Sequence, residues 1–386
     1  MRPSKRLDQI PPYLFAELER KIAAQRAAGV DVISLGIGDP DTPTYPPIVA
    51  AAQRAVADPS THSYPSNRGR PEFRQAVAAF YDRRFGVLLD PETEVMPAIG
   101  AKECIFNLNL AFLDPGDVAL ASDPGYPVYT GGPLLAGAEP VLMGLDPERG
   151  FAPDFDAISA DALDRARLMF LNYPNNPTGA VVPDGLFERA VELGRRAELL
   201  VVHDNAYSET TFDGYVAPSF LATPGAKEAG VEVFSLSKGY NMTGWRCAAI
   251  VGNPAAIAQY WRLKSNIDSG LFDAVQLAGA AALAPEVDAE VEAMNAIYQR
   301  RRDLVCDALA RSGVRVTPPK ATIYVWAPVP DGFRSAAEYC EYVLEQAGVV
   351  ISPGGAYGPN GEGFFRISLT TTEERLLEAV ERLRRL

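Results

Sequence analysis

The stretch VEVFSLSKGYNMTGWRC, residues 231–247, joins a predicted buried strand to an unusual set of polar side chains. A short run rich in apolar residues, 231–234, is followed by Ser235, Ser237 and Lys238, and Arg246 lies eight residues further on. The chain holds only seven lysines, so a lysine just beyond the end of a buried strand needs an explanation. A solvent-exposed lysine is the simplest interpretation, against which the surrounding sequence must be weighed.

This stretch belongs to a series of short apolar runs that alternate with helical patterns between about residues 45 and 285. The runs include EVMPAI, DVALAS, ARLMFLN, LLVVHD, VEVFSL and CAAIVG. Most lack strict alternation of apolar and polar residues, which is typical of strands that are buried on both faces. Amphipathic segments such as LFERAVELGRRAE lie between several of them. The pattern predicts an α/β fold in which helices cover a mostly parallel sheet.

The sequence changes character near residue 286. A long charged helix is predicted over EVDAEVEAMNAIYQRRRDLVCDALARSG, and shorter helices and apolar runs follow it. Because one hydrophobic core rarely serves a chain of 386 residues, we expect two contiguous domains. The expected division is a large domain over 46–285, a small α/β domain over 286–386, and an N-terminal segment, 1–45. The amphipathic part of that segment, around YLFAELERKIAAQRAAG, is expected to pack with the small domain.

Composition argues against several classes of protein. The net charge is −13, from 36 basic and 49 acidic residues, which argues against a nucleic-acid or anionic-membrane surface. No apolar run reaches the roughly 18 residues expected of a membrane helix, and the N-terminus lacks the apolar segment of a signal peptide. Four widely separated cysteines without a C-x-x-C pair are typical of reduced thiols. We therefore expect a cytoplasmic protein without nucleic-acid or membrane partners.

The two histidines, His62 and His203, restrict the possible chemistry further. A histidine-rich metal centre is excluded, and a Ser-His-Asp triad would have to use one of the two. His203 lies inside the apolar run LLVVHD, where a packed core histidine is the commoner case. We therefore expect neither a metal site nor a histidine-based mechanism.

Polar residues follow five of the predicted strands, at the edge of the sheet where ligands of open parallel sheets bind. The set comprises Gly100-Ala101-Lys102 after EVMPAI, Tyr126 after DVALAS, Asn175 and Asn176 after ARLMFL, Asp204 and Tyr207 after LLVVH, and Ser235, Ser237 and Lys238 after VEVF. Each has an ordinary explanation on its own, as a turn or a helix cap. Their occurrence at five strand ends together predicts a ligand site.

One end of this site has the residue types that hold a phosphate. The helix start at Gly100 and Ala101 offers free backbone N–H groups, Ser235 offers a hydroxyl and Arg246 offers a bidentate cation. Lys238 would then be a buried amine beside another cation. Desolvation and like charge both lower the pKa of an amine, so Lys238 could act as a neutral nucleophile near pH 7.

The remaining residue types match a flat, charged ring. Asp204 can hold a protonated ring nitrogen, Tyr126 can stack on a ring, and Tyr207 and Asn176 can donate to a phenolate oxygen. A heteroaromatic ring with a phosphate, an aldehyde, a phenolate and a pyridinium nitrogen is pyridoxal 5′-phosphate. Lys238 would hold this cofactor as a Schiff base.

With these residues in place, the sequence resembles the pyridoxal-phosphate-dependent class I and II aminotransferases of fold type I. The resemblance covers nearly the whole chain. It rests on LGIGDPD (35–41), YPSNRGRPEFR (64–74), GAKE (100–103), DPGYPVY (123–129), NYPNNPTG (172–179), DNAY (204–207), SLSKGYNMTGWR (235–246) and FFRIS (364–368). It is greatest to the LL-diaminopimelate aminotransferase branch of the family.

The resemblance implies a role for each residue that contacts the cofactor ring. Lys238 resembles the Schiff-base lysine, which also moves the proton of the substrate Cα. Asp204 resembles the partner of the ring nitrogen, Asn176 and Tyr207 the donors to the ring oxygen, and Tyr126 the stacking aromatic.

The resemblance also implies phosphate ligands and substrate contacts. The implied phosphate ligands are Ala101, Lys102, Ser235 and Arg246. Arg366 resembles the arginine that binds the substrate α-carboxylate, and Gly38 and Asn176 resemble further substrate contacts. Tyr64 resembles a tyrosine that reaches the phosphate of a neighbouring subunit, and a second such contact is expected near Ser269. A homodimer with shared active sites is therefore expected.

The implied reaction moves an amino group between an L-amino acid and a 2-oxo acid, such as 2-oxoglutarate, by a ping-pong mechanism. In some LL-diaminopimelate enzymes a glutamate three residues after the equivalent of Tyr64 receives the distal ammonium of the substrate. Here Asn67 stands at that position and Arg68 follows it. Arg68 could favour a second carboxylate, or it could be a surface residue in a turn. LL-diaminopimelate and an aspartate-, alanine- or aromatic-type substrate therefore both remain open.

Other classes of protein use related folds. A C–S lyase or a decarboxylase could share this scaffold. A regulatory binding protein would need a DNA-binding module, for which the sequence leaves no room before LGIGDPD. A nicotinamide dehydrogenase is disfavoured, because the G-x-G of Gly36 and Gly38 lacks a third glycine and a suitable downstream acid.

Overall fold

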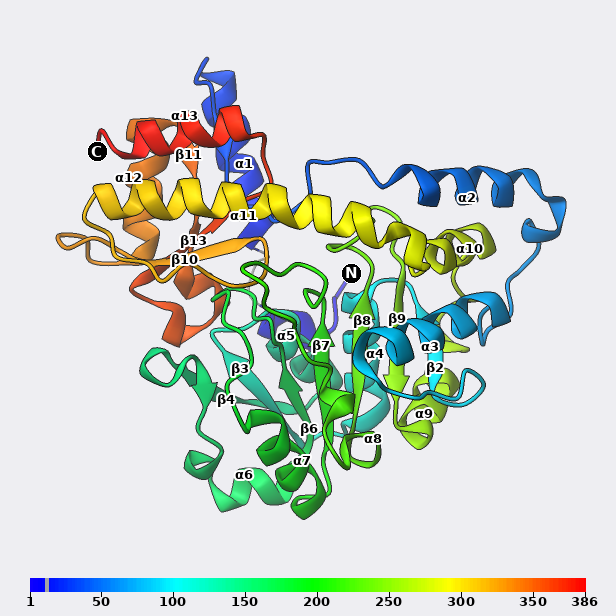
Figure 1. The fold of residues 1–386 in the computed structure, drawn as a ribbon. Coiled ribbons are helices and arrows are strands. Elements are labelled where there is room, and N and C mark those ends of the chain that lie inside the picture. Colours follow the sequence, from blue (N-terminus) through cyan, green and yellow to red (C-terminus); the bar gives the residue numbers. More distant parts are fainter. Residues whose placement is uncertain (11–13) are drawn as a thin grey trace.

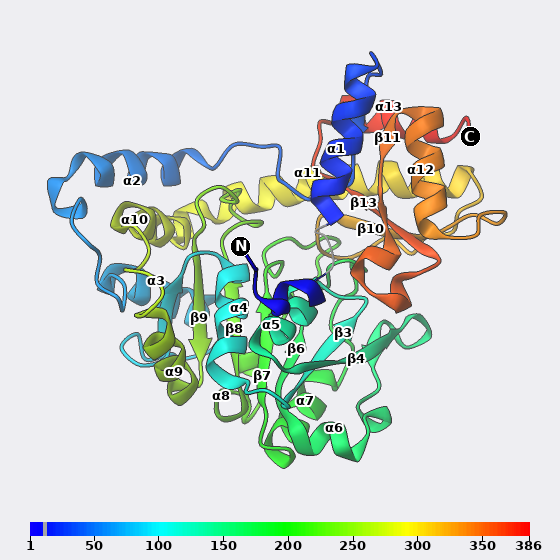
Figure 2. The ribbon, with the colours of Figure 1, turned by 180° about the vertical axis from the view of Figure 1, so that it is seen from behind.

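An eight-stranded sheet forms the centre of the molecule in the computed structural model, which describes residues 1–10 and 14–386. Its strands lie in the order β2-β9-β8-β7-β6-β3-β4-β5 (Figures 1 and 2). Their bounds are β2 Val95–Ala98, β3 Val118–Asp123, β4 Glu139–Asp146, β5 Ala152–Pro153, β6 Ala166–Leu171, β7 Leu200–Asn205, β8 Gly230–Ser235 and β9 Ala248–Gly252. Each of the six predicted apolar runs forms one of these strands, so the predicted α/β fold is confirmed.

The sheet is mixed rather than wholly parallel. Strands β4, β3, β6, β7 and β8 are parallel neighbours, whereas β9 is antiparallel to both β8 and β2. The amino end of β9 therefore lies at the edge where the parallel strands have their carboxyl ends. Arg246 precedes β9 by two residues and is brought to this edge for that reason.

Helices cover both faces of the sheet (Figures 1 and 2). The helices of this part of the chain are α3 Pro71–Phe85, α4 Ala101–Phe112, α5 Val128–Ala136, α6 Ala160–Arg165, α7 Leu186–Arg196, α8 Ala226–Ala229, α9 Pro254–Lys264 and α10 Asp273–Ala282, together with α2 Pro46–Ala57, which packs against α10. Successive residues of β3 belong to different core clusters, with Val118 and Leu120 in one and Ala119 and Ala121 in the other. Both faces are thus buried, which explains why the strands lack an alternating pattern.

The C-terminal part forms a second lobe. Its elements are α11 Asp288–Arg311, β10 Tyr324–Pro328, α12 Ala336–Ala347, β11 Val349–Val350, β12 Ser352–Pro353, β13 Phe364–Ser368 and α13 Glu373–Leu383. Strands β10, β13 and β12 form an antiparallel sheet. Helix α11, yellow in Figure 1, runs from this lobe across the central sheet toward α10.

Residues 14–34 of the N-terminal segment lie with the second lobe, whereas Lys5–Gln9 lie beside α5 of the large domain (Figure 2). Strand β1 (Ile33–Ser34) pairs in parallel with β11, and Ile22 of α1 (Leu14–Ala27) packs against Val32, Leu344 and Val350. Residues 11–13, which include the first residue of the predicted amphipathic segment, lie outside the described residues. We keep the division into 1–45, 46–285 and 286–386 as a proposal; the contacts of β1 and α1 support it, whereas Lys5–Gln9 contact α5 of the large domain.

Short 3₁₀ helices fill several connections: η1 Lys5–Gln9, η2 Pro59–Thr61, η3 Pro147–Arg149, η4 Phe155–Ala157, η5 Phe220–Ala222, η6 Pro285–Val287, η7 Gly354–Tyr357 and η8 Pro359–Gly361. In the part of the chain that the structure describes, no helix has both the length and the apolar character needed to cross a membrane. The four cysteines are free and buried.

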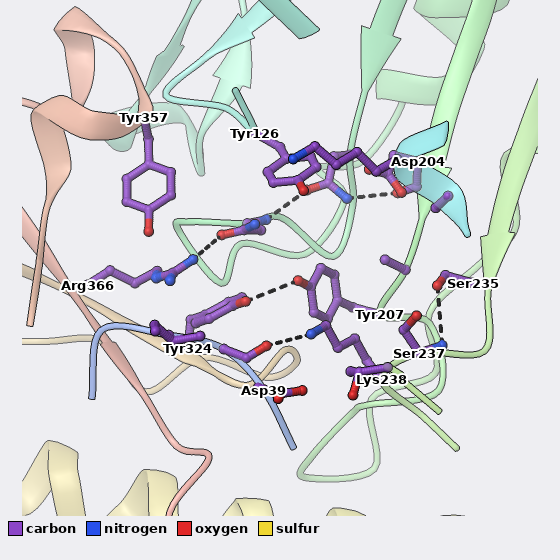
Figure 3. A pocket seen from close by; sticks show the side chains of 18 of the residues that line it. Asp39, Tyr126, Asp204, Tyr207, Ser235, Ser237, Lys238, Tyr324, Tyr357 and Arg366 are labelled. Carbon is purple, nitrogen blue, oxygen red and sulfur yellow. Dashed lines mark hydrogen bonds between the residues drawn. The ribbon is translucent and has the colours of Figure 1, made fainter. Parts of the chain in front are cut away.

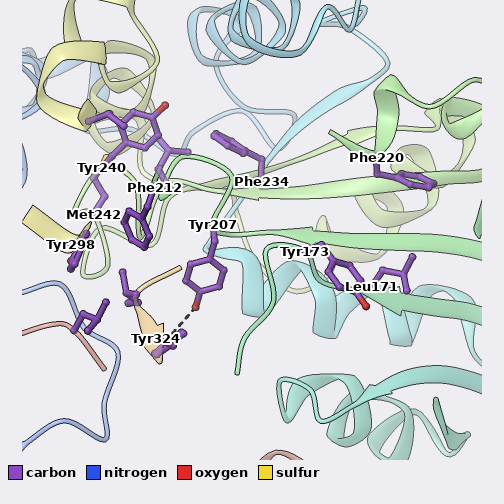
Figure 4. Close-up of a cluster of buried hydrophobic side chains, with 14 of the residues drawn as sticks. Leu171, Tyr173, Tyr207, Phe212, Phe220, Phe234, Tyr240, Met242, Tyr298 and Tyr324 are labelled. Atoms are coloured by element: carbon purple, nitrogen blue, oxygen red, sulfur yellow. Dashed lines mark hydrogen bonds between the residues drawn. The ribbon is translucent and has the colours of Figure 1, made fainter. Parts of the chain in front are cut away.

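One hydrophobic cluster connects the core with the region where the two lobes meet (Figure 4). It runs from Phe220, beneath the central sheet, past Phe234 to Tyr207 at the end of β7. There the ring of Tyr207 meets that of Tyr324, from β10 of the second lobe, at 5.9 Å between centroids. The strand ends that carry the predicted site are therefore fixed by core packing on one side and by the second lobe on the other.

Candidate active site

A cavity of about 360 Å³ lies at the carboxyl ends of β6, β7 and β8, where β10 and β13 approach the central sheet. Most of the residues predicted for the site line this cavity; Gly100, Asn175, Tyr64 and Ser269 do not. Side chains from both lobes face one another across it (Figure 3). The residues that sequence reasoning assigned to separate strand ends are therefore brought together in space.

Lys238 lies inside the cavity, three residues after β8 (Figure 3). Its Nζ donates a hydrogen bond of 2.5 Å to the carbonyl oxygen of Gly38, from the N-terminal segment. Burial lowers the pKa of Lys238, and the positive charges of Arg366 and Arg246 act in the same direction. The simplest interpretation, a lysine in bulk solvent, is wrong, and the direction predicted for its pKa is confirmed.

Asp204, in β7, is a buried carboxylate with one oxygen left free. Its Oδ2 accepts a hydrogen bond of 2.7 Å from the Tyr129 hydroxyl, whereas its Oδ1 is buried without a hydrogen-bond partner. Burial raises the pKa of Asp204 to about 6, although Tyr129 and His203 oppose the shift. An unfilled carboxylate oxygen at the wall of a cavity matches the N–H of a cationic ring.

The residues predicted to bind a phosphate lie together at one end of the cavity, and we call this group, Ala101, Ser235 and Arg246, the phosphate cradle. Helix α4 begins at Ala101, directly after Gly100, so its first backbone N–H groups are free to bind an anion. Ser235 and the guanidinium of Arg246 line the same cavity. A Cβ atom on Gly100 would lie only 2.2 Å from Nη2 of Arg246, so the approach of this side chain depends on the glycine.

Lys102 and Tyr126 lie beside each other next to this cradle. The Nζ atom of Lys102 is 5.8 Å from the centroid of the Tyr126 ring. Tyr126 follows β3 and presents its ring at the cavity wall (Figure 3). The pair places a cation near the cradle and a flat aromatic surface next to it.

Arg366, in β13, forms the opposite end of the cavity. Its side chain is only 1% exposed, and it donates hydrogen bonds to Oδ1 of Asn176 at 2.7 Å and to the carbonyl oxygen of Gly36 at 2.8 Å. The guanidinium lies between the rings of Tyr324 and Tyr357, at 3.9 and 4.8 Å from their centroids (Figure 3). No carboxylate pairs with it among the described residues, so Arg366 is not half of an ion pair there.

Sequence reasoning did not single out Tyr129, which bonds to Asp204, or Asn172, Tyr324 and Tyr357, which line the cavity. Tyr129 and Asn172 lie inside the motifs DPGYPVY and NYPNNPTG, so the signal was present; Asn172 donates from Nδ2 to the Asp204 carbonyl at 2.7 Å. Tyr324 and Tyr357 come from the second lobe, in segments without a local site signal.

Tyr324 is the most tightly connected of these additional residues. The Tyr207 hydroxyl donates to the Tyr324 oxygen at 3.3 Å. Burial raises the pKa of Tyr207 well above its ordinary value. Burial acts in the same direction on Tyr324, but the positive charges of Arg366 and Lys238 outweigh it and lower the pKa of Tyr324. The two hydroxyls thus form a polarised pair at the centre of the cavity.

The residues assigned to subunit contacts and to substrate choice lie outside the cavity of their own chain. Tyr64 is 90% exposed, and neither Asn67 nor Ser269 lines the cavity. Arg68 donates from Nη2 to the carbonyl oxygen of Glu92 at 2.9 Å, and its guanidinium lies 5.2 Å from the ring of Trp261.

The cavity fits pyridoxal 5′-phosphate at three points. The cradle of α4 and Arg246 suits its phosphate, the free Oδ1 of Asp204 suits its ring nitrogen, and the Lys238 amine suits its aldehyde. Each point is a property of the protein itself: a helix start, an unfilled buried acceptor and a buried amine of lowered pKa.

Gly100→Ala is expected to weaken cofactor binding by at least about tenfold, since the added methyl group would displace Arg246 and remove a charge-assisted contact. An absorbance titration of cofactor-free protein with pyridoxal 5′-phosphate measures the change. Gly116→Ala is the matched control, because Gly116 also has a positive φ but has open space where the Cβ would lie. Equal affinities of the two variants would show that the approach of Arg246 is unimportant.

Comparison with known proteins agrees with this geometry. Residues 30–383 match the family described as aminotransferase class I and II. An LL-diaminopimelate aminotransferase from Desulforudis audaxviator is 54% identical over 381 residues, covering 99% of this chain and 97% of that protein. One from Moorella thermoacetica is 52% identical over 385 residues, covering 100% and 98%.

Solved structures show the same similarity. Substrate-bound BacF from Bacillus subtilis superposes with a TM-score of 0.95 at 39% identity, covering 100% of this chain and 98% of that one. A double mutant of Thermus thermophilus aspartate aminotransferase superposes with a TM-score of 0.92 at 31% identity, covering 100% of both chains.

Proposed function

The chain belongs to the class I and II aminotransferases, and on this basis we propose that it transfers an amino group between LL-diaminopimelate and 2-oxoglutarate, as a step of lysine biosynthesis in the cytoplasm. It is a pyridoxal-phosphate-dependent transaminase of fold type I. We choose this substrate because the chain shares more than 50% sequence identity, along essentially its whole length, with enzymes named LL-diaminopimelate aminotransferase.

When bound, pyridoxal 5′-phosphate supplies an electron sink for the negative charge that develops at the substrate Cα. We assign its phosphate to Ala101, Lys102, Ser235 and Arg246, whose groups gather at one end of the cavity. Tyr126 offers the surface on which the ring stacks.

Asp204 holds a proton at the ring nitrogen in this mechanism. A carboxylate in a buried site forms a strong pair with a cationic N–H, because little water competes there. Tyr129 occupies Oδ2 and leaves Oδ1 for the ring. Nδ2 of Asn176 would donate to the ring oxygen, and so would the Tyr207 hydroxyl once it turned away from Tyr324.

Lys238 moves the proton between the substrate Cα and the cofactor. This task needs a neutral amine, and burial beside two guanidinium groups lowers the lysine pKa in that direction. The hydrogen bond to the Gly38 carbonyl keeps the amine inside the cavity. Gly38 also lines the cavity in which a substrate would bind.

Arg366 binds the α-carboxylate of the substrate, supported by Asn176. A buried guanidinium without a carboxylate partner among the described residues is available for an anionic ligand, and the flanking tyrosine rings hold its plane. Planar two-point binding of a carboxylate is a property of arginine that lysine lacks.

Arg366→Lys is therefore expected to raise the KM for the amino acid about 10- to 100-fold, the loss of roughly one charge-assisted hydrogen bond, while the affinity for the cofactor stays unchanged. The dependence of the half-reaction rate on glutamate concentration gives the first quantity and an absorbance titration the second. Arg300→Lys, in the exposed ion pair with Glu373, is the control. A fall in cofactor affinity without a change in KM would contradict the assignment.

A homodimer with shared active sites is part of the proposal. Tyr64, Ile267 and Phe272 are exposed, and Gly270 packs against the backbone of Ser66, which brings these two loops together. A neighbouring chain placed there would receive Tyr64 and the loop of Ser269. A holoenzyme that sediments as a monomer would rule this out.

The positive charge of Arg68 would oppose a substrate with a distal ammonium if it faced that ammonium, but its contacts place it elsewhere. Its guanidinium is held by the Glu92 carbonyl and the Trp261 ring of its own chain, which supports the interpretation as a turn residue. Asn67 stays exposed and offers an amide oxygen.

A panel of amino acids mixed with the holoenzyme tests the substrate. We expect LL-diaminopimelate and glutamate to convert the cofactor to its amine form. Aspartate, alanine and aromatic amino acids should react with a kcat/KM at least about 100-fold lower, because they leave polar groups of the site unpaired. Efficient reaction of aspartate or an aromatic amino acid would overturn the choice of substrate. Release of pyruvate with ammonia, or of CO₂, would instead indicate a lyase or a decarboxylase.

A further inference from the structure

A fully buried carboxylate lies in the central sheet next to the strand that carries Asp204. It belongs to Glu232 of β8, which is 0% exposed and pairs in register with His203 of β7. Nδ1 of His203, also 0% exposed, lies 2.8 Å from Oε2 of Glu232. The mechanism described above uses neither side chain.

The neighbours of Glu232 favour its ionised form. Its two oxygens accept hydrogen bonds from the Tyr81 hydroxyl at 2.6 Å, from Nδ2 of Asn205 at 2.8 Å, from the Ser219 hydroxyl at 3.1 Å and from the Phe220 N–H at 2.9 Å. The Asn205 and Phe220 N–H groups can only donate, and the Tyr81 and Ser219 hydroxyls donate here as well, so the four contacts favour an ionised carboxylate. Burial raises the pKa of Glu232, but His203 and the donors outweigh it and hold the pKa below its ordinary value.

An ionised carboxylate without water needs a cation, and His203 is its one ion-pair partner among the described residues. The second ring nitrogen of His203, Nε2, lies 2.9 Å from the carbonyl oxygen of Tyr173 and 3.3 Å from the Tyr173 nitrogen. The closer contact is with an acceptor. Both ring nitrogens thus face oxygen atoms, which suits a doubly protonated imidazolium. The other close neighbours of the ring are Phe187 and Phe220, which carry no charge.

The ion pair of His203 and Glu232 is connected to the active site through the backbone of β7, in which His203 directly precedes Asp204. Side chains alternate along a strand, so His203 and Asn205 point to one face of β7 and Asp204 to the other. Both His203 and Asn205 bond to Glu232, which fixes the chain on either side of Asp204. The positive charge of His203 also acts directly on Asp204, since it lowers the pKa of Asp204 against the effect of burial.

We propose that His203 is an imidazolium held by Glu232, and that this pair keeps the Asp204 carboxylate ionised and in position for the ring nitrogen of the cofactor. His203 and Glu232 are thus positioning residues, which act on the reaction through Asp204. This proposal rests on the role proposed above for Asp204.

The charge on His203 can be measured in the wild-type protein. Only two histidines are present, so ¹⁵N spectra of histidine-labelled holoenzyme contain signals from His203 and from the exposed His62 alone. We expect both ring nitrogens of His203 to carry protons at neutral pH. One bare and one protonated nitrogen would indicate a neutral ring and would overturn the proposal without any variant.

The effect on Asp204 can be measured by binding. Cofactor-free protein is titrated with pyridoxal 5′-phosphate and with an analogue whose ring nitrogen is replaced by carbon, and the ratio of the two dissociation constants is determined. His203→Gln keeps a donor toward Glu232 but removes the charge, and the double variant His203→Gln with Glu232→Gln removes both charges. In each we expect the preference for the natural cofactor to fall about tenfold, the equivalent of one pKa unit.

His62→Gln is the matched control and should keep the wild-type preference. An equal loss of affinity for both compounds in the His203 variants would indicate a purely structural role and would overturn the proposal. The Asp204→Asn variant distinguishes a wrong role for Asp204 from a wrong role for the pair of His203 and Glu232. If this variant keeps the wild-type preference, the role proposed for Asp204 fails; if it loses the preference and the His203 variants do not, only the pair is wrongly assigned.

Discussion

Replacing Lys238 with alanine is expected to lower the rate of the half-reaction with glutamate by at least about 10⁴-fold, because it removes the group that carries the Cα proton. Lys238 places an amine of lowered pKa between the Asp204 and Arg366 ends of the cavity. The other lysine that lines the cavity, Lys102, lies over the Tyr126 ring at the phosphate end. The cavity without Lys238 therefore keeps its binding groups and loses its base.

Rapid mixing of the holoenzyme with glutamate, followed by the absorbance of the bound cofactor, measures this rate. Lys320→Ala, which changes an exposed lysine on a loop before β10, is the control and should react as the wild type does. The Lys238→Ala variant should still bind cofactor through the phosphate cradle. A variant that retained more than about a hundredth of the wild-type rate would show that another group moves the proton.

The central sheet could be predicted because its strands are buried on both faces and therefore appear as continuous apolar runs. The direction of β9 was not predicted, since CAAIVG has the same apolar pattern in either direction. The connection from Ser235 to Ala248 contained the missing information. Its 12 residues are about the minimum for the crossover helix that a parallel neighbour would need, and they include Gly239, Asn241 and Gly244, which favour turns. The reversal of β9 is what brings Arg246 to the cavity.

The part of the site carried by strand ends could be predicted in the same way. Asp204, Asn176 and Lys238 each follow or end a buried strand, and the topology of the sheet brings such positions together. Tyr324 and Tyr357 could not be predicted, because they reach the cavity only when the second lobe packs against the first. Nothing in the run IYVWAPVP distinguishes a cavity residue from a core residue.

The second large effect is expected for Asp204→Asn, which should lower the half-reaction rate about 10³-fold through the loss of one preorganised charge. An amide has nearly the shape of a carboxylate and can still accept the hydrogen bond from Tyr129. It cannot hold a proton on the ring nitrogen, because it carries no negative charge. Asp331→Asn, at an exposed position in a loop, is the control.

The same substitution is expected to stabilise the cofactor-free protein above pH 6. Burial raises the pKa of Asp204 to about 6 in the folded protein, from 3.8. Between about pH 4 and 6 the folded state therefore keeps a proton that the unfolded chain has released, and the free energy of unfolding falls as the pH rises. Asp204→Asn removes this dependence. Its gain should be absent near pH 4 and reach about 3 kcal/mol at pH 8, from a pKa difference of about two units.

Urea unfolding of cofactor-free wild type and variant, at pH 4 and at pH 8, measures this gain. A residue that only packed in the core would lose stability equally at both pH values, which would contradict the assignment of Asp204. The ionised Asp204 carboxylate, which is buried away from water, should instead lower the free energy of unfolding of the cofactor-free protein. Bound cofactor provides the missing partner for Oδ1, so the advantage of the variant should shrink in the holoenzyme. Lower activity together with higher stability of the empty protein is the combination expected of a buried acid that serves catalysis.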